Sequence, residues 1–189
     1  MKPKTLLITG FEPFGAENRN PSWEAVKALP DRIGEWTLHK LLLPVEFGRA
    51  ADLAIDAAAG CRADAILCVG LAAGRTAVTP EAIGINVRDA SIPDNAGQKP
   101  AGEPVDPHGP AAYFSTLPTR EMTEAIAGAG IPAKRSYTAG TYVCNDLLYS
   151  LLHRFAGTDV RIAFVHIPSE RDLPLESSIR ALEAAIQAI

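Results

Sequence analysis

In this 189-residue chain, Cys144 is the side chain whose sequence neighbours most favour a reactive nucleophile. It follows a loop-forming stretch, residues 139–141, and leucines at helical spacing come after it. This spacing predicts a helix that begins at about Cys144, where free backbone N–H groups and the helix dipole favour a negative charge. The thiolate is the nucleophilic form of cysteine, so this position is expected to lower the pKa of Cys144 and make it reactive. The alternative interpretation is a buried structural cysteine.

A reactive thiol needs a base, and histidine is suited to that role at neutral pH. Three of the four histidines are expected to be structural or solvated: His39, His108 and His153. His166 differs because it ends an apolar strand, residues 162–165, and therefore lies at the carboxyl edge of the predicted sheet. Open α/β sheets place their sites at this edge. The helix of Cys144 also begins just beyond a strand, so both side chains are expected there.

A carboxylate that orients the histidine would complete a triad. Glu81 and Asp94 are the candidates, because both follow the buried strand 65–69 in stretches rich in turn residues. Spacing in the sequence does not choose between the two.

Alternating strand and helix patterns surround these residues. Strands are expected at residues 5–9, 36–43, 65–69, 83–87, 134–138 and 162–167. One helix is expected to begin at Pro21, with Asn20 as its N-cap. Further helices are expected at residues 48–59, with a stop at Gly60, and at residues 121–127, 144 to about 157, and 175–189. One long irregular stretch covers residues 91–110. The pattern predicts one domain over residues 1–189, an α/β sandwich around a mostly parallel sheet.

Composition excludes several classes of function. The net charge is −4 with no basic block, so neither nucleic acid nor anionic lipid is an expected partner. No hydrophobic run is long enough to cross a bilayer. Three cysteines argue against a disulfide framework and for a cytoplasmic location, and their spacing predicts no metal site. Residues 70–75 contain two glycines but lack the ending of a phosphate loop, so nucleotide binding is not expected.

With these residues in view, the chain resembles the pyroglutamyl peptidase I family of cysteine peptidases from about Thr9 to its C-terminus. Many ordered motifs carry the resemblance: Thr9-Gly10-Phe11-Glu12-Pro13-Phe14-Gly15, Asn20-Pro21-Ser22, Leu43-Pro44-Val45, Glu81 with Ile85-Asn86-Val87, Ile92-Pro93-Asp94-Asn95, residues 109–118, residues 139–145, and His166-Ile167-Pro168.

The resemblance implies that Cys144 is the nucleophile, His166 the base and Glu81 the orienting carboxylate. It also implies a phosphorylase/hydrolase-like α/β/α fold with a mixed sheet, no cofactor, a homotetramer, and removal of N-terminal pyroglutamate from peptides through an acyl-enzyme. The pyroglutamyl ring is a small uncharged lactam, so its pocket should be largely apolar. The residues expected to line it, with an ordinary core role as the alternative, are Phe11, Phe14, Ile92, Tyr142 and Val143.

The chain departs from the family pattern at four places. Leu71 stands where glutamine is usual, and Asp146 where histidine is usual. Ser91 replaces an arginine expected near the developing oxyanion, and loss of one such donor can lower the rate about 100-fold or more. The loop after Pro168 is short. These differences leave two alternatives open: a related amidase or peptidase of altered specificity, and a weakly active or non-catalytic binding member of the family.

Overall fold

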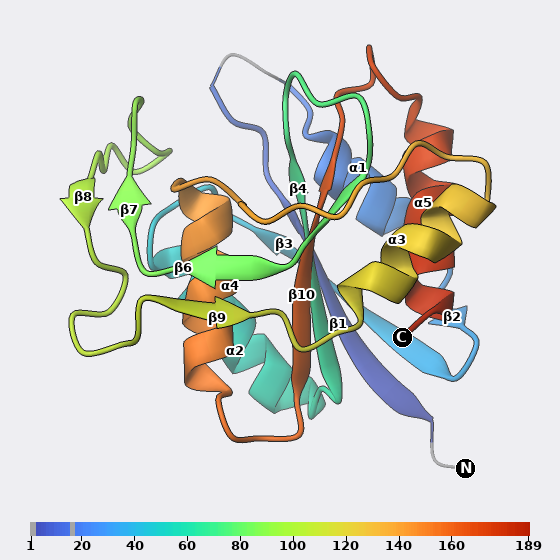
Figure 1. The fold of residues 1–189 in the computed structure, drawn as a ribbon, viewed down its shortest axis with the longest axis horizontal. Helices are drawn as coiled ribbons and strands as arrows, with labels where there is room; N and C mark the ends of the chain where they lie inside the picture. Colours follow the sequence, from blue (N-terminus) through green and yellow to red (C-terminus); the bar gives the residue numbers. More distant parts are fainter. Residues whose placement is uncertain (1–2, 16–17) are drawn as a thin grey trace.

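The computed structural model describes residues 3–15 and 18–189 and contains one six-stranded sheet, in the order β2-β3-β1-β4-β10-β5 (Figure 1). Its strands are β1 (Lys4–Phe11), β2 (Arg32–Ile33), β3 (Trp36–Leu43), β4 (Ala65–Leu71), β5 (Thr79–Glu81) and β10 (Arg161–Ile167). The four central strands pair in parallel, whereas β2 and β5 pair antiparallel at the two edges. The sheet is therefore mixed and mostly parallel, as the sequence predicts.

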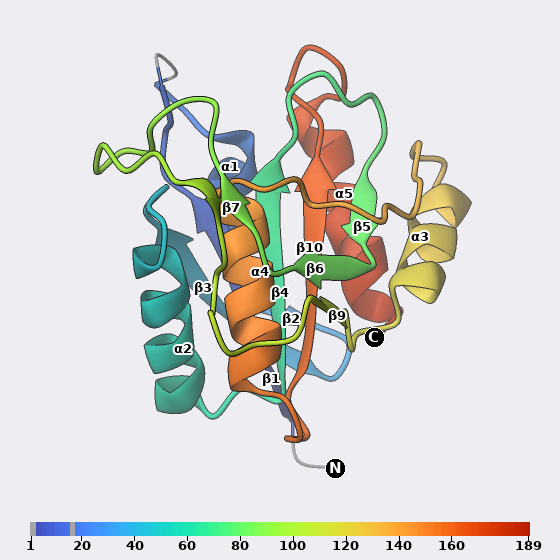
Figure 2. The ribbon, with the colours of Figure 1, turned by 60° about the vertical axis from the view of Figure 1, so that its left-hand side comes forward.

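In the described part of the chain, five helices cover the two faces of this sheet (Figure 2). They are α1 (Pro21–Ala28), α2 (Arg49–Cys61), α3 (Thr119–Gly128), α4 (Val143–Arg154) and α5 (Leu175–Gln187). Helices α1, α3 and α5 lie on one face, and α2 and α4 on the other. Within the described residues, none of the helices combines the length and the hydropathy that a membrane crossing requires.

Side chains that alternate along the central strands fill two hydrophobic cores, one on each face of the sheet. Leu6 and Ile8 of β1 belong to the core under α1, α3 and α5, whereas Leu7 belongs to the core under α2 and α4. Successive side chains of a strand point to opposite faces, so a strand covered on both sides must be apolar throughout. Cys68 of β4 lies in the second core and is fully buried. Its side chain therefore belongs to the same face of the sheet as α4.

The start of α1 agrees with the sequence prediction, whereas the end of α2 does not. Asn20 caps α1 by accepting a hydrogen bond of 3.0 Å from the backbone N–H of Ser22. Helix α2, however, continues through Gly60 to Cys61, so the predicted stop at Gly60 is wrong. Arg62 takes the left-handed conformation (φ 54°) in place of a glycine and ends the helix there.

The predicted strand at 134–138 does not form a continuous ladder. Residues 133–136 run parallel to β5 and pair with it through two isolated bridges, Val78 with Ala133 and Glu81 with Ser136. Between these bridges lies Pro80, which has no backbone N–H to donate. One rung of the ladder is therefore missing.

The described residues also form two short ribbons: β6 (Ile83–Ile85) with β9 (Ala112–Phe114), and β7 (Arg88–Asp89) with β8 (Ala101–Glu103). Strand β6 is shorter than the predicted 83–87, because the backbone turns at Asn86, where the N–H of Val87 donates to the carbonyl of Ile85. The side chain of Asn145 bonds to the backbone of Ile85 and to the carbonyl of Val87 at this turn. The stretch 91–110 is irregular apart from β8.

Candidate active site

Cys144 is the second residue of α4 and lies close to the sheet. A Cβ atom added to Gly70 of β4 would be only 3.0 Å from the Sγ atom of Cys144. Gly70 pairs directly with His166 of β10 in the parallel register. Directly paired residues present their side chains on the same face of a sheet, so His166 projects on the face where the thiol lies.

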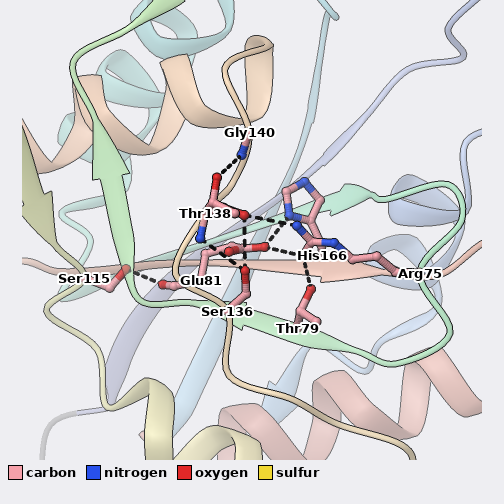
Figure 3. Close-up of polar contacts among 8 residues, drawn as sticks. All are labelled: Arg75, Thr79, Glu81, Ser115, Ser136, Thr138, Gly140 and His166. Carbon is pink, nitrogen blue, oxygen red and sulfur yellow. Dashed lines mark hydrogen bonds and ion pairs between the residues drawn. The ribbon is translucent and has the colours of Figure 1, made fainter.

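His166 contacts Glu81 within the buried part of this face. The Nδ1 atom of His166 lies 2.8 Å from Oε1 of Glu81, and the side chains are 5% and 0% exposed (Figure 3). Because Nδ1 is engaged by the carboxylate, Nε2 is the ring nitrogen available for proton transfer. The contact is possible because β5 pairs antiparallel with β10 and brings Glu81 beside Phe164.

Asp94, the other carboxylate candidate, does not contact His166. Its oxygens accept hydrogen bonds from the backbone N–H groups of Phe47, Ala96 and Gln98, at 2.7–3.0 Å. Asp94 therefore fixes the shape of the irregular segment, and Glu81 is the carboxylate that the fold brings to the imidazole.

Burial controls protonation in this group of residues. It lowers the pKa of His166, an effect that Glu81 opposes and the charge of Arg75 reinforces. Burial alone would raise the pKa of Glu81, but hydrogen bonds and charge from His166, together with the Ser136 hydroxyl and Arg75, bring it below its ordinary value. The pair at neutral pH is a neutral imidazole against an ionised carboxylate.

The expected lowering of the Cys144 pKa is wrong for this structure. The pKa of the Cys144 thiol is raised to about 12, mainly by burial and further by the nearby Cys68 and Glu81. The charge of Arg75 and the backbone N–H of Cys144 itself lower it, but by less. Desolvation therefore raises the pKa of Cys144 by more than the start of the helix lowers it, and the resting thiol is neutral. It becomes a thiolate only when its proton moves to a base.

A cavity of about 370 Å³ opens beside the thiol. Its wall contains four of the five residues expected to line a pocket: Phe11, Phe14, Tyr142 and Val143, together with Cys144 itself. Ile92 is not part of the wall and is 50% exposed, so that expectation is not met. Tyr142 packs between the rings of Phe14 and Phe47 at centroid distances of 5.5 and 5.2 Å. The wall also includes Leu71, the residue at which the chain departs from the family pattern.

Asp146, a second departure, has a structural environment. Its side chain is fully buried, and its Oδ2 atom accepts a hydrogen bond of 2.7 Å from the N–H of Gly48 at the start of α2. Its Oδ1 atom lies 2.5 Å from Nε of Arg88. Burial raises the pKa of Asp146, and Gly48 and Arg88 oppose this increase. Arg88 is therefore held by Asp146, while Ser91 is exposed and makes no hydrogen bond within the described part of the chain.

Sequence reasoning missed Arg75, whose guanidinium contacts Glu81 (Figure 3). A single arginine after a glycine-rich turn gives no signal of its own, because its partner is set by the pairing of β5 with β10. Over residues 3–15 and 18–189, no three His, Cys, Asp or Glu side chains gather as a metal site.

Comparison with known proteins gives concordant results. A family model described as pyroglutamyl peptidase matches residues 4–189. A pyrrolidone-carboxylate peptidase of Levilactobacillus brevis is 46% identical over 196 residues, which cover 97% of this chain and 96% of that protein. One from Escherichia fergusonii is 50% identical over 167 residues, covering 87% of this chain and 78% of the relative.

Solved structures resemble this chain over almost all of its length. Pyroglutamyl peptidase I from Bacillus amyloliquefaciens superimposes with a TM-score of 0.93 at 40% identity, covering 98% of this chain and 96% of the other. A mutant pyrrolidone carboxyl peptidase from Pyrococcus furiosus gives a TM-score of 0.93 at 36% identity and covers 97% of both chains.

Proposed function

Because this chain belongs to the pyroglutamyl peptidase family, we propose that it is a cysteine peptidase that removes pyroglutamate from the N-terminus of peptides. One observation carries the assignment of roles: His166 contacts Glu81 beside the cavity that Cys144 lines. A nucleophile, a base and an orienting carboxylate are the groups that acyl transfer to a thiol requires. The apolar wall of Phe11, Phe14 and Val143 suits a small uncharged lactam.

In the first half of the reaction, Sγ of Cys144 attacks the carbonyl carbon that joins pyroglutamate to the next residue. The thiol proton passes to Nε2 of His166, whose resulting charge is balanced by Glu81 on Nδ1. No side chain among the described residues caps α4, so backbone N–H groups at its start are free to bind the oxyanion. When the C–N bond breaks, the leaving amine takes the proton from His166, and pyroglutamate remains as a thioester.

In the second half, His166 accepts a proton from water as the water oxygen attacks the thioester carbonyl. Collapse of this intermediate breaks the C–S bond and releases pyroglutamate. The proton held by His166 returns to the sulfur. The enzyme regains its neutral thiol and imidazole, which is the protonation state that burial favours in the resting structure.

The direct test is release of a chromogenic amine from a pyroglutamyl amide. We expect turnover by the native chain, with no turnover by Cys144→Ala or His166→Ala at unchanged circular dichroism. A native chain that binds pyroglutamate but releases no amine from any amide would instead be a non-catalytic binding member of the family.

Leu71 favours one other candidate function, an amidase or peptidase of altered specificity. It forms part of the cavity wall in place of a glutamine that could hydrogen bond to substrate. Running prolyl and acetyl-amino-acid amides beside the pyroglutamyl amide decides between the two. A higher kcat/KM for either of those substrates than for the pyroglutamyl amide would show that pyroglutamate is not the preferred N-terminal group.

We also propose that the chain forms a homotetramer and acts in the cytoplasm. The family resemblance supports the first proposal, and the odd number of cysteines supports the second. Sedimentation equilibrium should give the mass of four chains, and cell fractionation should recover the protein with cytoplasmic markers. A mass of one chain, or recovery outside the cytoplasm, would contradict the respective proposal.

A further inference from the structure

We propose that Arg75 is a positioning residue of the reaction, which holds Glu81 and the loop before Cys144 in the arrangement that the reaction needs. This inference rests on the proposed function, because it assigns a role within the same site. Arg75 lies in the segment between β4 and β5 and contacts neither the cavity wall nor a reacting atom in the described structure. Its hydrogen bonds therefore act on the reaction through other residues.

The first contact of Arg75 is with the carboxylate. Its Nη1 atom lies 2.6 Å from Oε1 of Glu81, the same oxygen that faces Nδ1 of His166 (Figure 3). The other oxygen of Glu81, Oε2, is buried and accepts no hydrogen bond within the described part of the chain. The position of the carboxylate is thus set by two donors that meet at one oxygen.

Arg75 also supplies the permanent positive charge beside this carboxylate. The Glu81 side chain is fully buried, and among the described residues its ion-pair partners are Arg75 and His166. The imidazole is neutral in the resting state, so only the guanidinium compensates the buried charge. Without Arg75, the buried carboxylate would lose its permanent counter-charge and one of the two donors that meet at its Oε1 atom.

The second contact of Arg75 is with the nucleophile's loop. Its Nη2 atom donates a hydrogen bond of 3.0 Å to the carbonyl of Thr138, and Nη1 also contacts the Thr79 hydroxyl. The Thr138 hydroxyl in turn accepts a hydrogen bond of 3.1 Å from the N–H of Gly140. One guanidinium therefore joins β5, which carries the carboxylate, to the loop that leads into α4 and Cys144.

The charge of Arg75 also acts on the base. The titratable and charged groups that face His166 are Glu81 from β5, Cys144 from α4 and Arg75 from the β4–β5 segment. Arg75 disfavours the imidazolium, so removing it should raise the pKa of His166 and make the base protonated over a wider range of acidic pH. The acid limb of a pH–rate profile reports this change.

The experiment compares Arg75→Gln and Arg75→Lys with Arg135→Gln. Arg135 is a matched control: its guanidinium bonds to Thr119 and Tyr137 and makes no contact with Glu81 or His166. We expect Arg75→Gln to lower kcat by about 10²-fold with KM changed less than about threefold. Its acid limb in kcat/KM should move to higher pH. Arg75→Lys should recover part of kcat and return the acid limb toward its native position, and Arg135→Gln should match the native enzyme.

A native kcat in Arg75→Gln would overturn the inference. A lower kcat in Arg75→Gln would also overturn it if the acid limb does not move and Arg75→Lys recovers no activity. Alkylation of Cys144 by iodoacetamide, followed against pH in the same variants, separates this result from the proposed function. If the native chain hydrolyses no pyroglutamyl amide, the function fails. The Arg75 role then still stands or falls by whether the pH dependence of Cys144 alkylation shifts in Arg75→Gln.

Discussion

Gly70 and Cys144 share a space that admits the thiol only because the glycine has no side chain. A Cβ atom on Gly70 would lie 3.0 Å from Sγ of Cys144 and 2.7 Å from Cζ of Phe164. Both distances are shorter than side-chain contacts normally allow, and Phe164 is fully buried and has little room to move. Gly70 thus sets the height at which the thiol lies above the strand next to His166.

Gly70→Ala should therefore lower activity more than stability. We expect the displaced thiol to reduce kcat by about 10²-fold and overpacking to lower the free energy of unfolding by about 1–3 kcal/mol. Gly60→Ala is the control, because a Cβ there meets nothing within 4 Å in helix α2 and should be neutral or slightly stabilising. Amide hydrolysis and urea unfolding measure the two effects. Native kcat in Gly70→Ala would show that the thiol position is not critical.

The two carboxylate candidates should respond to substitution in different ways. Glu81→Gln should lower kcat by about 10³-fold, because an amide keeps a hydrogen bond to Nδ1 but cannot balance an imidazolium charge. Asp94→Asn should leave kcat within a few-fold of native and lower the free energy of unfolding by about 1–3 kcal/mol, because its carboxylate binds three backbone N–H groups. A severe loss of kcat in Asp94→Asn with a mild one in Glu81→Gln would reverse the assignment.

The three cysteines should differ in how they react with iodoacetamide. Cys68 is fully buried with a pKa raised to about 12, so it should stay unlabelled in the folded protein. Cys144 should react fastest, because His166 can take its proton, and this labelling should be lost in His166→Ala. Cys61 is partly exposed, and its slow labelling should be the same in both proteins, which makes it an internal control. Peptide mass mapping after limited labelling gives the rates, and faster labelling of Cys61 in the native protein would exclude assistance by His166.

The ion pair between Arg88 and Asp146 should contribute to stability rather than to turnover. Arg88→Ala leaves a fully buried carboxylate without its cation, and we expect the free energy of unfolding to fall by about 3 kcal/mol. Replacing both residues, Arg88→Met with Asp146→Leu, should recover part of this loss, because no unpaired charge is then left buried, whereas the N–H of Gly48 loses its acceptor. Chemical denaturation of the single and double variants measures the difference. If the double variant is no more stable than Arg88→Ala, the loss does not arise from an uncompensated charge.

Much of the fold could be predicted because its signals are local. Apolar runs such as that of β10 and the Asn20 cap of α1 depend on neighbouring residues, and the structure confirms them. The helix that starts at Cys144 is confirmed for the same reason. The predicted strand at 134–138 failed because its ladder depends on Pro80, more than fifty residues away in the sequence.

Other features of the site depended on tertiary packing. Glu81 lies in a strand of three residues that contains a proline, so no periodic pattern marks its partner in the sheet. The pKa of Cys144 is shifted upward rather than downward as predicted, because desolvation of the thiol beside the sheet outweighs the effect of the helix terminus that the sequence reveals. The role of Arg75 could not be predicted from the sequence, because its partners Glu81 and Thr138 are brought together only by the fold.

The pairing of β5 with β10 has a consequence for folding of the chain. His166 and Glu81 are 85 residues apart in the sequence, and they meet only through this antiparallel edge pairing. Contacts between distant segments carry a large loop-closure entropy, which favours their formation after local structure. A partly folded chain would then possess the helix of Cys144 but lack the assembled base. The thiol of a newly made or misassembled molecule would remain an unassisted, protonated sulfhydryl, and peptide cleavage would begin only when the edge of the sheet has closed.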